Sequence, residues 1–296
     1  MTELNFATTS DGVRYALRPA EMAQPTVRTV LIHGVGTSCD YWFALVDRLP
    51  KEWRVIAPDI PGSGYSRPVE GNSEIAAVSS VLLETLEGLP GEPAVPTVLV
   101  GHSLGALVAI EMAKQNPQFS DLLILVDPVL YRAEEVLTRF DRFVKMWRYS
   151  LVVLSQLAGV VINGKVSATI LRTRLARKLL LGTQLGKGPD VSPETLERCL
   201  RGTRGWPHFR VIPVIRAARK VHLGDAVTSL RSAVAVVRGS LDPLTNDQEI
   251  DRLSTECRLV SSASIGFAGH SPMLNMPSEL ATCLEFIVDS HVGGAK

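Results

Sequence analysis

The stretch VLVGHSLGALVAIEMAK, residues 98–114, decides the fold. A short apolar run typical of a strand ends at Gly101-His102-Ser103-Leu104-Gly105, and a helix-like pattern follows. A serine on such a sharp turn sits in strained backbone, and the flanking glycines let strand and helix approach closely. The helix also aims its N-terminus at the serine, where negative charge would develop. We therefore predict that Ser103 is a nucleophile.

Outside this stretch, short apolar segments alternate with helix-like ones. The apolar segments are rich in β-branched residues, which predicts strands buried on both faces, at residues 29–32, 53–57, 97–100, 122–126 and 233–237. The helix-like patterns cover residues 40–49, 73–89, 104–115, 245–253 and about 278–288. This alternation indicates βαβ units and a mostly parallel, doubly wound α/β sheet with helices on both faces.

The rhythm breaks between residues 131 and 224, where several amphipathic helical patterns occur and strand-like runs are few. We predict a core formed by residues 1–130 and 225–296, with a helical cap at 131–224. The cap holds 18 of the 31 Lys and Arg but only 6 of the 30 Asp and Glu, so it carries about +12 against about −11 for the core. Either the two parts attract each other, or the cap meets an anionic substrate, an acidic protein or an anionic surface.

These motifs resemble the α/β-hydrolase fold superfamily. Residues 31–36, LIHGVG, are similar to its strand and H-G-x-G loop, and residues 59–66, DIPGSGYS, to its D-x-P-G-x-G-x-S loop. The resemblance implies an eight-stranded, mostly parallel sheet, with a helical cap after the sixth strand. It favours the capped branch with a serine nucleophile, which includes esterases, carbon–carbon bond hydrolases and haloperoxidase-like enzymes.

A serine hydroxyl needs a base, and the base needs an acid that fixes its tautomer. The superfamily carries its base in a G-H-x-P context, which is found at Gly269-His270-Ser271-Pro272. Its acid commonly follows a strand in a G-x-x-D loop, which points to Asp242, and the order Ser103, Asp242, His270 fits this fold. Asp127, also after a strand, stays open as the alternative acid.

The tetrahedral intermediate of acyl transfer carries an oxyanion that backbone N–H groups stabilise. We predict that the N–H groups of Val35 and Leu104 form this oxyanion hole. Gly34 lets the loop approach the substrate. Trp147 and Trp206, in the cap, are expected to supply apolar walls of the substrate pocket.

Several other features bound the function. The sequence holds no zinc-ligand cluster, Walker motif or dinucleotide-binding fingerprint, so we expect no metal and no cofactor. No nucleic-acid motif accompanies the basic cap, and no apolar run is long enough for a transmembrane segment. The dispersed cysteines and the absence of an apolar leader favour the cytoplasm. Nothing in the sequence specifies an oligomeric state.

We therefore expect a serine hydrolase that cleaves a carboxylic ester, lactone or thioester of a small, partly apolar substrate through an acyl-enzyme intermediate. An anionic or carrier-linked substrate would suit the basic cap, because carrier proteins are acidic. The same triad also serves carbon–carbon bond hydrolases and acyltransferases, so these alternatives stay open. A ligand-binding receptor on a retained hydrolase scaffold is a third hypothesis, which the intact elbow, base and acid disfavour.

Overall fold

The structure is a computed structural model of the 296-residue chain. It describes residues 4–22, 24–70, 74–90, 94–128, 173, 184–202, 227, 229–242, 244–245, 247–256 and 259–292.

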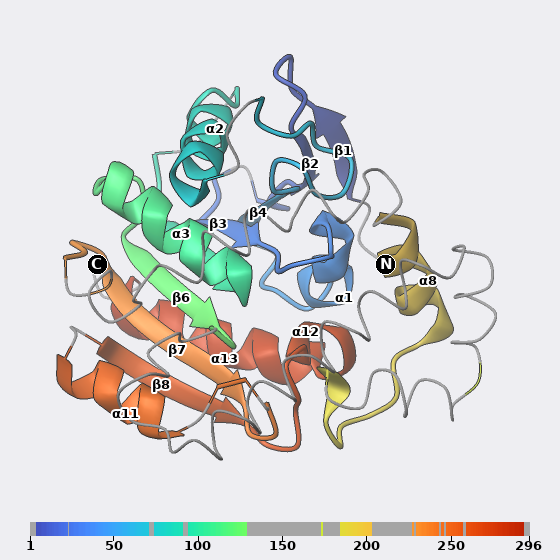
Figure 1. Cartoon of the computed structure of the whole chain (residues 1–296), viewed down its shortest axis with the longest axis vertical. Helices are drawn as coiled ribbons and strands as arrows, with labels where there is room; N and C mark the ends of the chain where they lie inside the picture. Colours follow the sequence, from blue (N-terminus) through green and yellow to red (C-terminus); the bar gives the residue numbers. More distant parts are fainter. Residues whose placement is uncertain are drawn as a thin grey trace.

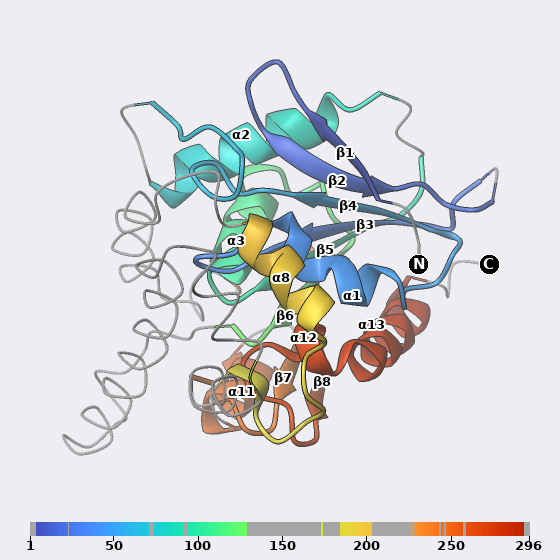
Figure 2. The same cartoon turned by 90° about the vertical axis from the view of Figure 1, so that its right-hand side faces the viewer.

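A single eight-stranded sheet organises these residues (Figure 1). Its strands are β1 (Asn5–Thr8), β2 (Arg14–Arg18), β3 (Val27–Ile32), β4 (Trp53–Pro58), β5 (Thr97–His102), β6 (Leu122–Val126), β7 (Ala233–Gly239) and β8 (Leu259–Ile265). They lie in the order β1-β2-β4-β3-β5-β6-β7-β8, which Figure 2 shows from one edge to the other. β1 and β2 pair antiparallel, β2 pairs antiparallel with β4, and every other pair is parallel. The predicted mostly parallel α/β sheet is thus confirmed.

Helices cover both faces of the sheet. They are η1 (Cys39–Trp42), α1 (Phe43–Val46), α2 (Ile75–Glu87), α3 (Leu104–Gln115), α8 (Pro193–Gly202), α11 (Asp247–Glu256), α12 (Pro272–Asn275) and α13 (Pro277–His291). α2 and α3 lie on one face, while α1 and α13 lie on the other (Figure 2). The one helix predicted at residues 40–49 is instead a 3-10 turn followed by a single short α-helix. The side chain of Ser38 caps that turn by accepting a hydrogen bond from the N–H of Asp40.

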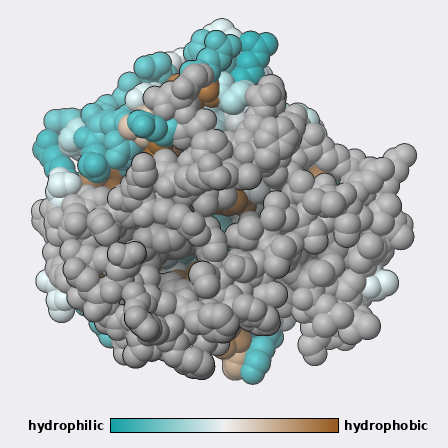
Figure 3. Space-filling model, viewed as in Figure 1, coloured by the Kyte–Doolittle hydropathy of each residue, from teal (hydrophilic) through white to brown (hydrophobic). Residues whose placement is uncertain are grey.

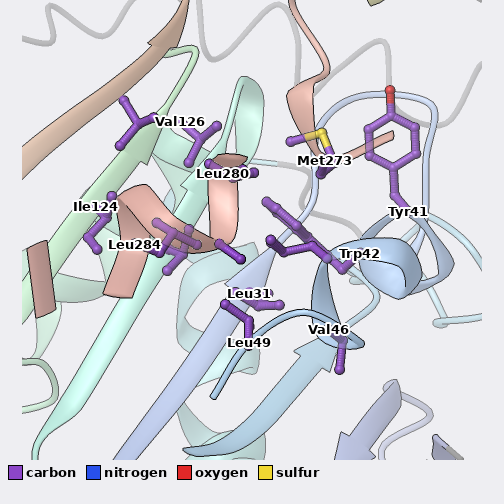
Figure 4. Packing of buried hydrophobic residues seen from close by; sticks show 14 of the residues in the cluster. Leu31, Tyr41, Trp42, Val46, Leu49, Ile124, Val126, Met273, Leu280 and Leu284 are labelled. Carbon is purple, nitrogen blue, oxygen red and sulfur yellow. The ribbon is translucent and has the colours of Figure 1, made fainter. Parts of the chain in front are cut away.

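The strands supply alternate residues to two hydrophobic cores. Val98 and Val100 of β5 point to the α1 and α13 face, whereas Leu99 between them points to the α2 and α3 face. This period of two is what an extended strand imposes, and it explains why central strands read as continuous apolar runs. In the first core, Leu280 and Leu284 of α13 pack over the sheet (Figure 4).

The described surface on the face shown in Figure 3 is mainly hydrophilic around α2 and the hairpin formed by β1 and β2. No helix among the described residues is long and apolar enough to cross a membrane.

The predicted cap at residues 131–224 falls mostly outside the described residues, so it stays a prediction. Within it the structure describes residue 173 and residues 184–202, which include α8. α8 packs against η1, where the guanidinium of Arg198 donates to the carboxylate of Asp40 at 3.3 Å and lies 3.6 Å from the centre of the Phe43 ring.

Candidate active site

Ser103 occupies the sharp turn between β5 and α3. Its φ of 54° lies in the left-handed region that few residues other than glycine adopt, and its N–H donates to the carbonyl of Val126 at 3.0 Å. A Cβ on Gly101 would lie 2.5 Å from the carbonyl oxygen of Gly105, and a Cβ on Gly105 would overlap the carbonyl oxygen of Ile32. Gly101 is therefore required for β5 and α3 to meet, as the sequence motif predicts, whereas Gly105 is required for α3 to approach the end of β3.

The loops after β7 and β8 carry Asp242 and His270 to the same edge of the sheet, because parallel strands place their carboxyl ends together. These loops are bonded to each other. The N–H of Leu241 donates to the carbonyl of Ala268 at 2.8 Å, and the N–H of Phe267 donates to the hydroxyl of Ser240 at 2.9 Å. Cross-bonding of this kind fixes the acid relative to the imidazole.

The three side chains meet in a buried chain of hydrogen bonds. Nε2 of His270 lies 3.0 Å from Oγ of Ser103, and Nδ1 lies 3.1 Å from Oδ2 of Asp242. The other carboxylate oxygen of Asp242 accepts the N–H of Leu244 at 2.9 Å. The structure thus brings together the serine, histidine and aspartate that the sequence analysis selected.

The charge on Asp242 determines the tautomer of His270. Burial raises the pKa of the Asp242 carboxyl, but the charge and hydrogen bond of His270, together with the N–H of Leu244, outweigh it, so the pKa is lowered. An ionised carboxylate only accepts hydrogen bonds, so Nδ1 of His270 carries the ring proton. Nε2 is then free to accept the hydroxyl proton of Ser103, which is the arrangement general-base catalysis needs.

Asp127, the alternative acid, lies beside this chain without bonding to the imidazole. Its Oδ1 accepts the N–H of Gly239 at 2.8 Å, whereas the hydrogen-bond partner of His270 is Asp242. The geometry therefore favours Asp242 as the acid that contacts the base.

Hydrogen bonds made by His33 and Thr37 hold the loop after β3 in place. Nε2 of the buried His33 accepts the N–H of Ile60 at 2.9 Å, so its Nδ1 carries the ring proton and donates to the carbonyl of Gly34 at 2.8 Å. The hydroxyl of Thr37 donates to the same carbonyl at 2.9 Å. Burial lowers the pKa of His33, which keeps this support neutral.

This loop lies directly against the nucleophile. A Cβ on Gly34 would stand 2.9 Å from Nδ1 of His102 and 3.2 Å from Cβ of Ser103. Within the described residues, the backbone N–H groups of Val35 and Leu104 donate to no acceptor. The two groups that the sequence nominates for an oxyanion are therefore both available near Ser103.

His102, which the motif places inside the elbow, contacts the base loop. Its Nε2–H donates to the backbone carbonyl of His270 at 2.7 Å, and its ring stacks on Tyr41 with centroids 5.9 Å apart. Burial, with repulsion from His270 added, lowers the pKa of His102 to about 3. A neutral His102 therefore anchors the residue that carries the base.

Sequence reasoning missed two polar residues that hold the loop of His270. The hydroxyl of Tyr41 donates to Oγ of Ser271 at 2.7 Å, and that hydroxyl donates to Oε1 of Gln184 at 2.7 Å. Each contact joins residues far apart in the chain, so no local pattern signals it. Gln184 belongs to the segment predicted as cap, and here it reaches the loop of His270.

The backbone of that segment also pairs with the base loop. The N–H of Ser271 donates to the carbonyl of Gln184 at 2.8 Å, and the N–H of Lys187 donates to the carbonyl of Phe267 at 2.8 Å. We call residues 184–187 and 267–271, joined in this way, the base-loop clamp. Trp147 and Trp206, the predicted pocket walls, lie outside the described residues.

Such a serine, histidine and aspartate at the carboxyl edge of a mostly parallel sheet define the α/β-hydrolase class of fold and site. Residues 29–282 match the alpha/beta hydrolase family, and the chain belongs to that family.

Individual relatives differ in how much of the chain they match. An uncharacterized protein of Mycobacterium bovis is 37% identical over 123 residues, which cover 42% of this chain and 34% of that protein. A pimeloyl-[acyl-carrier protein] methyl ester esterase of Aromatoleum aromaticum is 26% identical over 262 residues, covering 88% of this chain and 97% of the esterase. The structure of a thermophilic esterase from Thermogutta terrifontis superposes with a TM-score of 0.63 at 20% identity, covering 98% and 99% of the two chains. This last likeness concerns the fold.

Proposed function

We propose that this protein is a serine hydrolase that cleaves a carboxylic ester, lactone or thioester of a small, partly apolar substrate. The observation that carries the proposal is the chain of hydrogen bonds from Oγ of Ser103 through His270 to Asp242, at 3.0 and 3.1 Å. Membership of the alpha/beta hydrolase family supports it.

The geometry supports an acyl-enzyme route. Nε2 of His270 takes the hydroxyl proton as Ser103 attacks the carbonyl carbon, and the N–H groups of Val35 and Leu104 stabilise the oxyanion. His270 then protonates the leaving alcohol or thiol, and the acyl group stays on Ser103. Water, activated by His270 in the same way, releases the acid and restores the serine. Asp242 holds the ring and stabilises its cation in both halves.

A carrier-linked ester or thioester is the substrate class that the charge pattern favours. Residues 131–224 hold 18 basic and 6 acidic residues, which suits an acidic carrier protein. The name of the Aromatoleum esterase specifies an acyl-carrier-protein ester, and its alignment with this chain, at 26% identity, covers 88% of the chain. We therefore expect carrier-linked acyl esters to be turned over with a lower KM than the corresponding free methyl esters, and we expect this advantage to shrink at high salt.

Covalent labelling tests the proposal. A fluorophosphonate probe is expected to label the wild-type protein at Ser103, and Ser103→Ala is expected to abolish labelling and lower kcat by about 10⁵-fold. Substrates for the rate measurements are p-nitrophenyl esters of rising chain length, lactones and acyl-thioesters. Absence of both labelling and hydrolysis in a folded sample would contradict the enzyme and favour a binding protein on this scaffold.

A further inference from the structure

Asp127, at the end of β6, is buried completely beside the acid of the proposed triad. Its exposed fraction is 0%, and its φ of 44° is in the left-handed region. One carboxyl oxygen, Oδ1, accepts the N–H of Gly239 at 2.8 Å, and its own N–H donates to the carbonyl of Val237 at 2.9 Å. The chain therefore holds this side chain in one orientation.

The second oxygen of Asp127, Oδ2, has no such partner. It is buried and receives no N–H or O–H from the described residues. One oxygen of Asp127, one of Asp242 and one ring nitrogen of His270 all lie within 4.8 Å of one another. Two ionised carboxylates could not hydrogen-bond to each other, because neither has a donor.

The charges around the pair decide which carboxyl holds a proton. Asp242 already accepts Nδ1–H of His270 and the N–H of Leu244, both of which favour its ionised form. Burial, and then the charge of Asp242, raise the pKa of Asp127 well above its ordinary value, while the Gly239 N–H and the charge of Arg238 oppose this less strongly. Titratable groups near Asp127 among the described residues are Asp242, His270, Arg238 and Tyr41.

We propose that Asp127 stays a neutral carboxylic acid and donates its proton to the carboxylate of Asp242. It is a positioning residue: it contacts no reacting atom but gives Asp242 a third donor, beside Leu244 and His270, so that the carboxylate keeps its alignment with Nδ1. This inference rests on the proposed hydrolase mechanism for its effect on rate, but the protonation of Asp127 does not depend on that mechanism.

Asp127→Asn is the decisive variant. The amide copies a neutral acid, because its oxygen accepts from Gly239 and its NH₂ donates to Asp242. We expect kcat/KM to stay within about threefold of wild type, with the midpoint of the acidic limb of its pH profile unchanged. If Asp127 were ionised, Asn would remove a negative charge beside His270 and move that midpoint down by about one unit or more, which would overturn the proposal.

Asp127→Ala removes the donor that Asn retains. We expect kcat to fall about tenfold or more with KM unchanged, because Asp242, without this donor, no longer fixes the orientation of His270. The Asn variant is then expected to retain the kcat that the Ala variant loses. A folded Ala variant with wild-type kcat would overturn the positioning role. Circular dichroism and thermal unfolding establish whether Ala folds.

Infrared difference spectroscopy tests for the proton on Asp127 directly, and it needs neither enzymatic activity nor the Asp127→Ala variant. Protein treated with EDTA, in a Ser103→Ala background, is expected to show the carbonyl band of a buried carboxylic acid at neutral pH, absent from the same protein carrying Asp127→Asn. If both spectra lack the band, the proposal fails. Failure of the proposed function is seen separately, as absent fluorophosphonate labelling of the protein with Ser103 intact.

Discussion

The imidazole of His102 donates a 2.7 Å hydrogen bond to the backbone carbonyl of His270. The residue before the candidate nucleophile thereby holds the residue that carries the candidate base, across the ends of β5 and β8. Because the ring of His102 is buried, its protonation is unfavourable, and the stability of the fold around this bond therefore depends on pH.

His102→Gln tests this link through stability. The pKa of His102 is lowered from 6.5 to about 3, so between these values the unfolded chain binds a proton that the folded chain does not. Stability is therefore present above pH 6.5 and is lost as the pH falls toward 3, with a slope of about 1.4 kcal/mol per pH unit for this group. Glutamine keeps an N–H donor but does not titrate, so the slope should be shallower.

Urea unfolding at intervals from pH 7 to pH 4 measures the effect. His33, whose pKa burial also lowers, retains its share of the slope in the variant. Equal slopes for the wild type and His102→Gln would contradict the assignment of a neutral, buried His102.

Gly34 and Val35 test the proposed oxyanion hole as a matched pair. Alanine at position 34 places a Cβ 2.9 Å from Nδ1 of His102 and 3.2 Å from Cβ of Ser103, so the loop must shift. We expect Gly34→Ala to lower kcat by about 10²-fold, the cost of one misplaced donor. Val35→Ala leaves the backbone N–H in place and is expected to change kcat by less than about threefold. Steady-state measurement of kcat for both variants on one ester tests this difference, and the prediction fails if the two variants lose equal activity.

Gly105 and Gly266 form a second pair, for stability. A Cβ at Gly105 meets the backbone carbonyls of Ile32 and His33, which cannot rotate away, whereas nothing lies within 4 Å of a Cβ at Gly266. Gly105→Ala is expected to lower the free energy of unfolding by about 3 kcal/mol or to prevent folding. Gly266→Ala should leave the melting temperature nearly unchanged. Comparable melting temperatures for the two variants would show that the elbow tolerates a side chain.

Asp242→Asn tests which acid serves the base. Asparagine offers Nδ1 of His270 no charge, and its NH₂ favours the wrong tautomer, so we expect kcat to fall by about 10⁴-fold. Asp127→Asn is the control, because it changes a neighbouring carboxyl in the same way. A loss of less than tenfold in Asp242→Asn, with a large loss in Asp127→Asn, would reverse the assignment and make Asp127 the acid.

The elements that the sequence predicts well are those buried on both faces. β6 and α3 have the predicted bounds, because a continuous apolar run and a helix starting directly after the elbow leave few alternatives. β1 and β2 were not predicted. Every residue of β1 is exposed, so no hydrophobic pattern marks it, and its pairing with β2 creates the strand. β8 was not predicted from its own sequence either, because three of the seven residues in LVSSASI are serine and they interrupt the apolar run.

The candidate site likewise contains residues that the sequence identifies and residues that it does not. Ser103, Asp242 and His270 were selectable because each follows a strand in a short motif with its own chemistry, and the structure brings the three together. Tyr41 and Gln184 were not selectable. They meet at Ser271 only because folding joins segments that are 230 and 87 residues away from it in the chain. The proton shared by Asp127 and Asp242 depends on such folding as well.

The base-loop clamp has a consequence for how such a protein diverges. Its two backbone hydrogen bonds, from Ser271 to Gln184 and from Lys187 to Phe267, use main-chain atoms only. A substitution that leaves the backbone path unchanged therefore leaves these two bonds in place. Within residues 184–187 the exposed side chain of Lys187 is therefore free to change, whereas Gly186 is not, because its φ is 65° and a Cβ there would lie 2.5 Å from the carbonyl oxygen of Phe267.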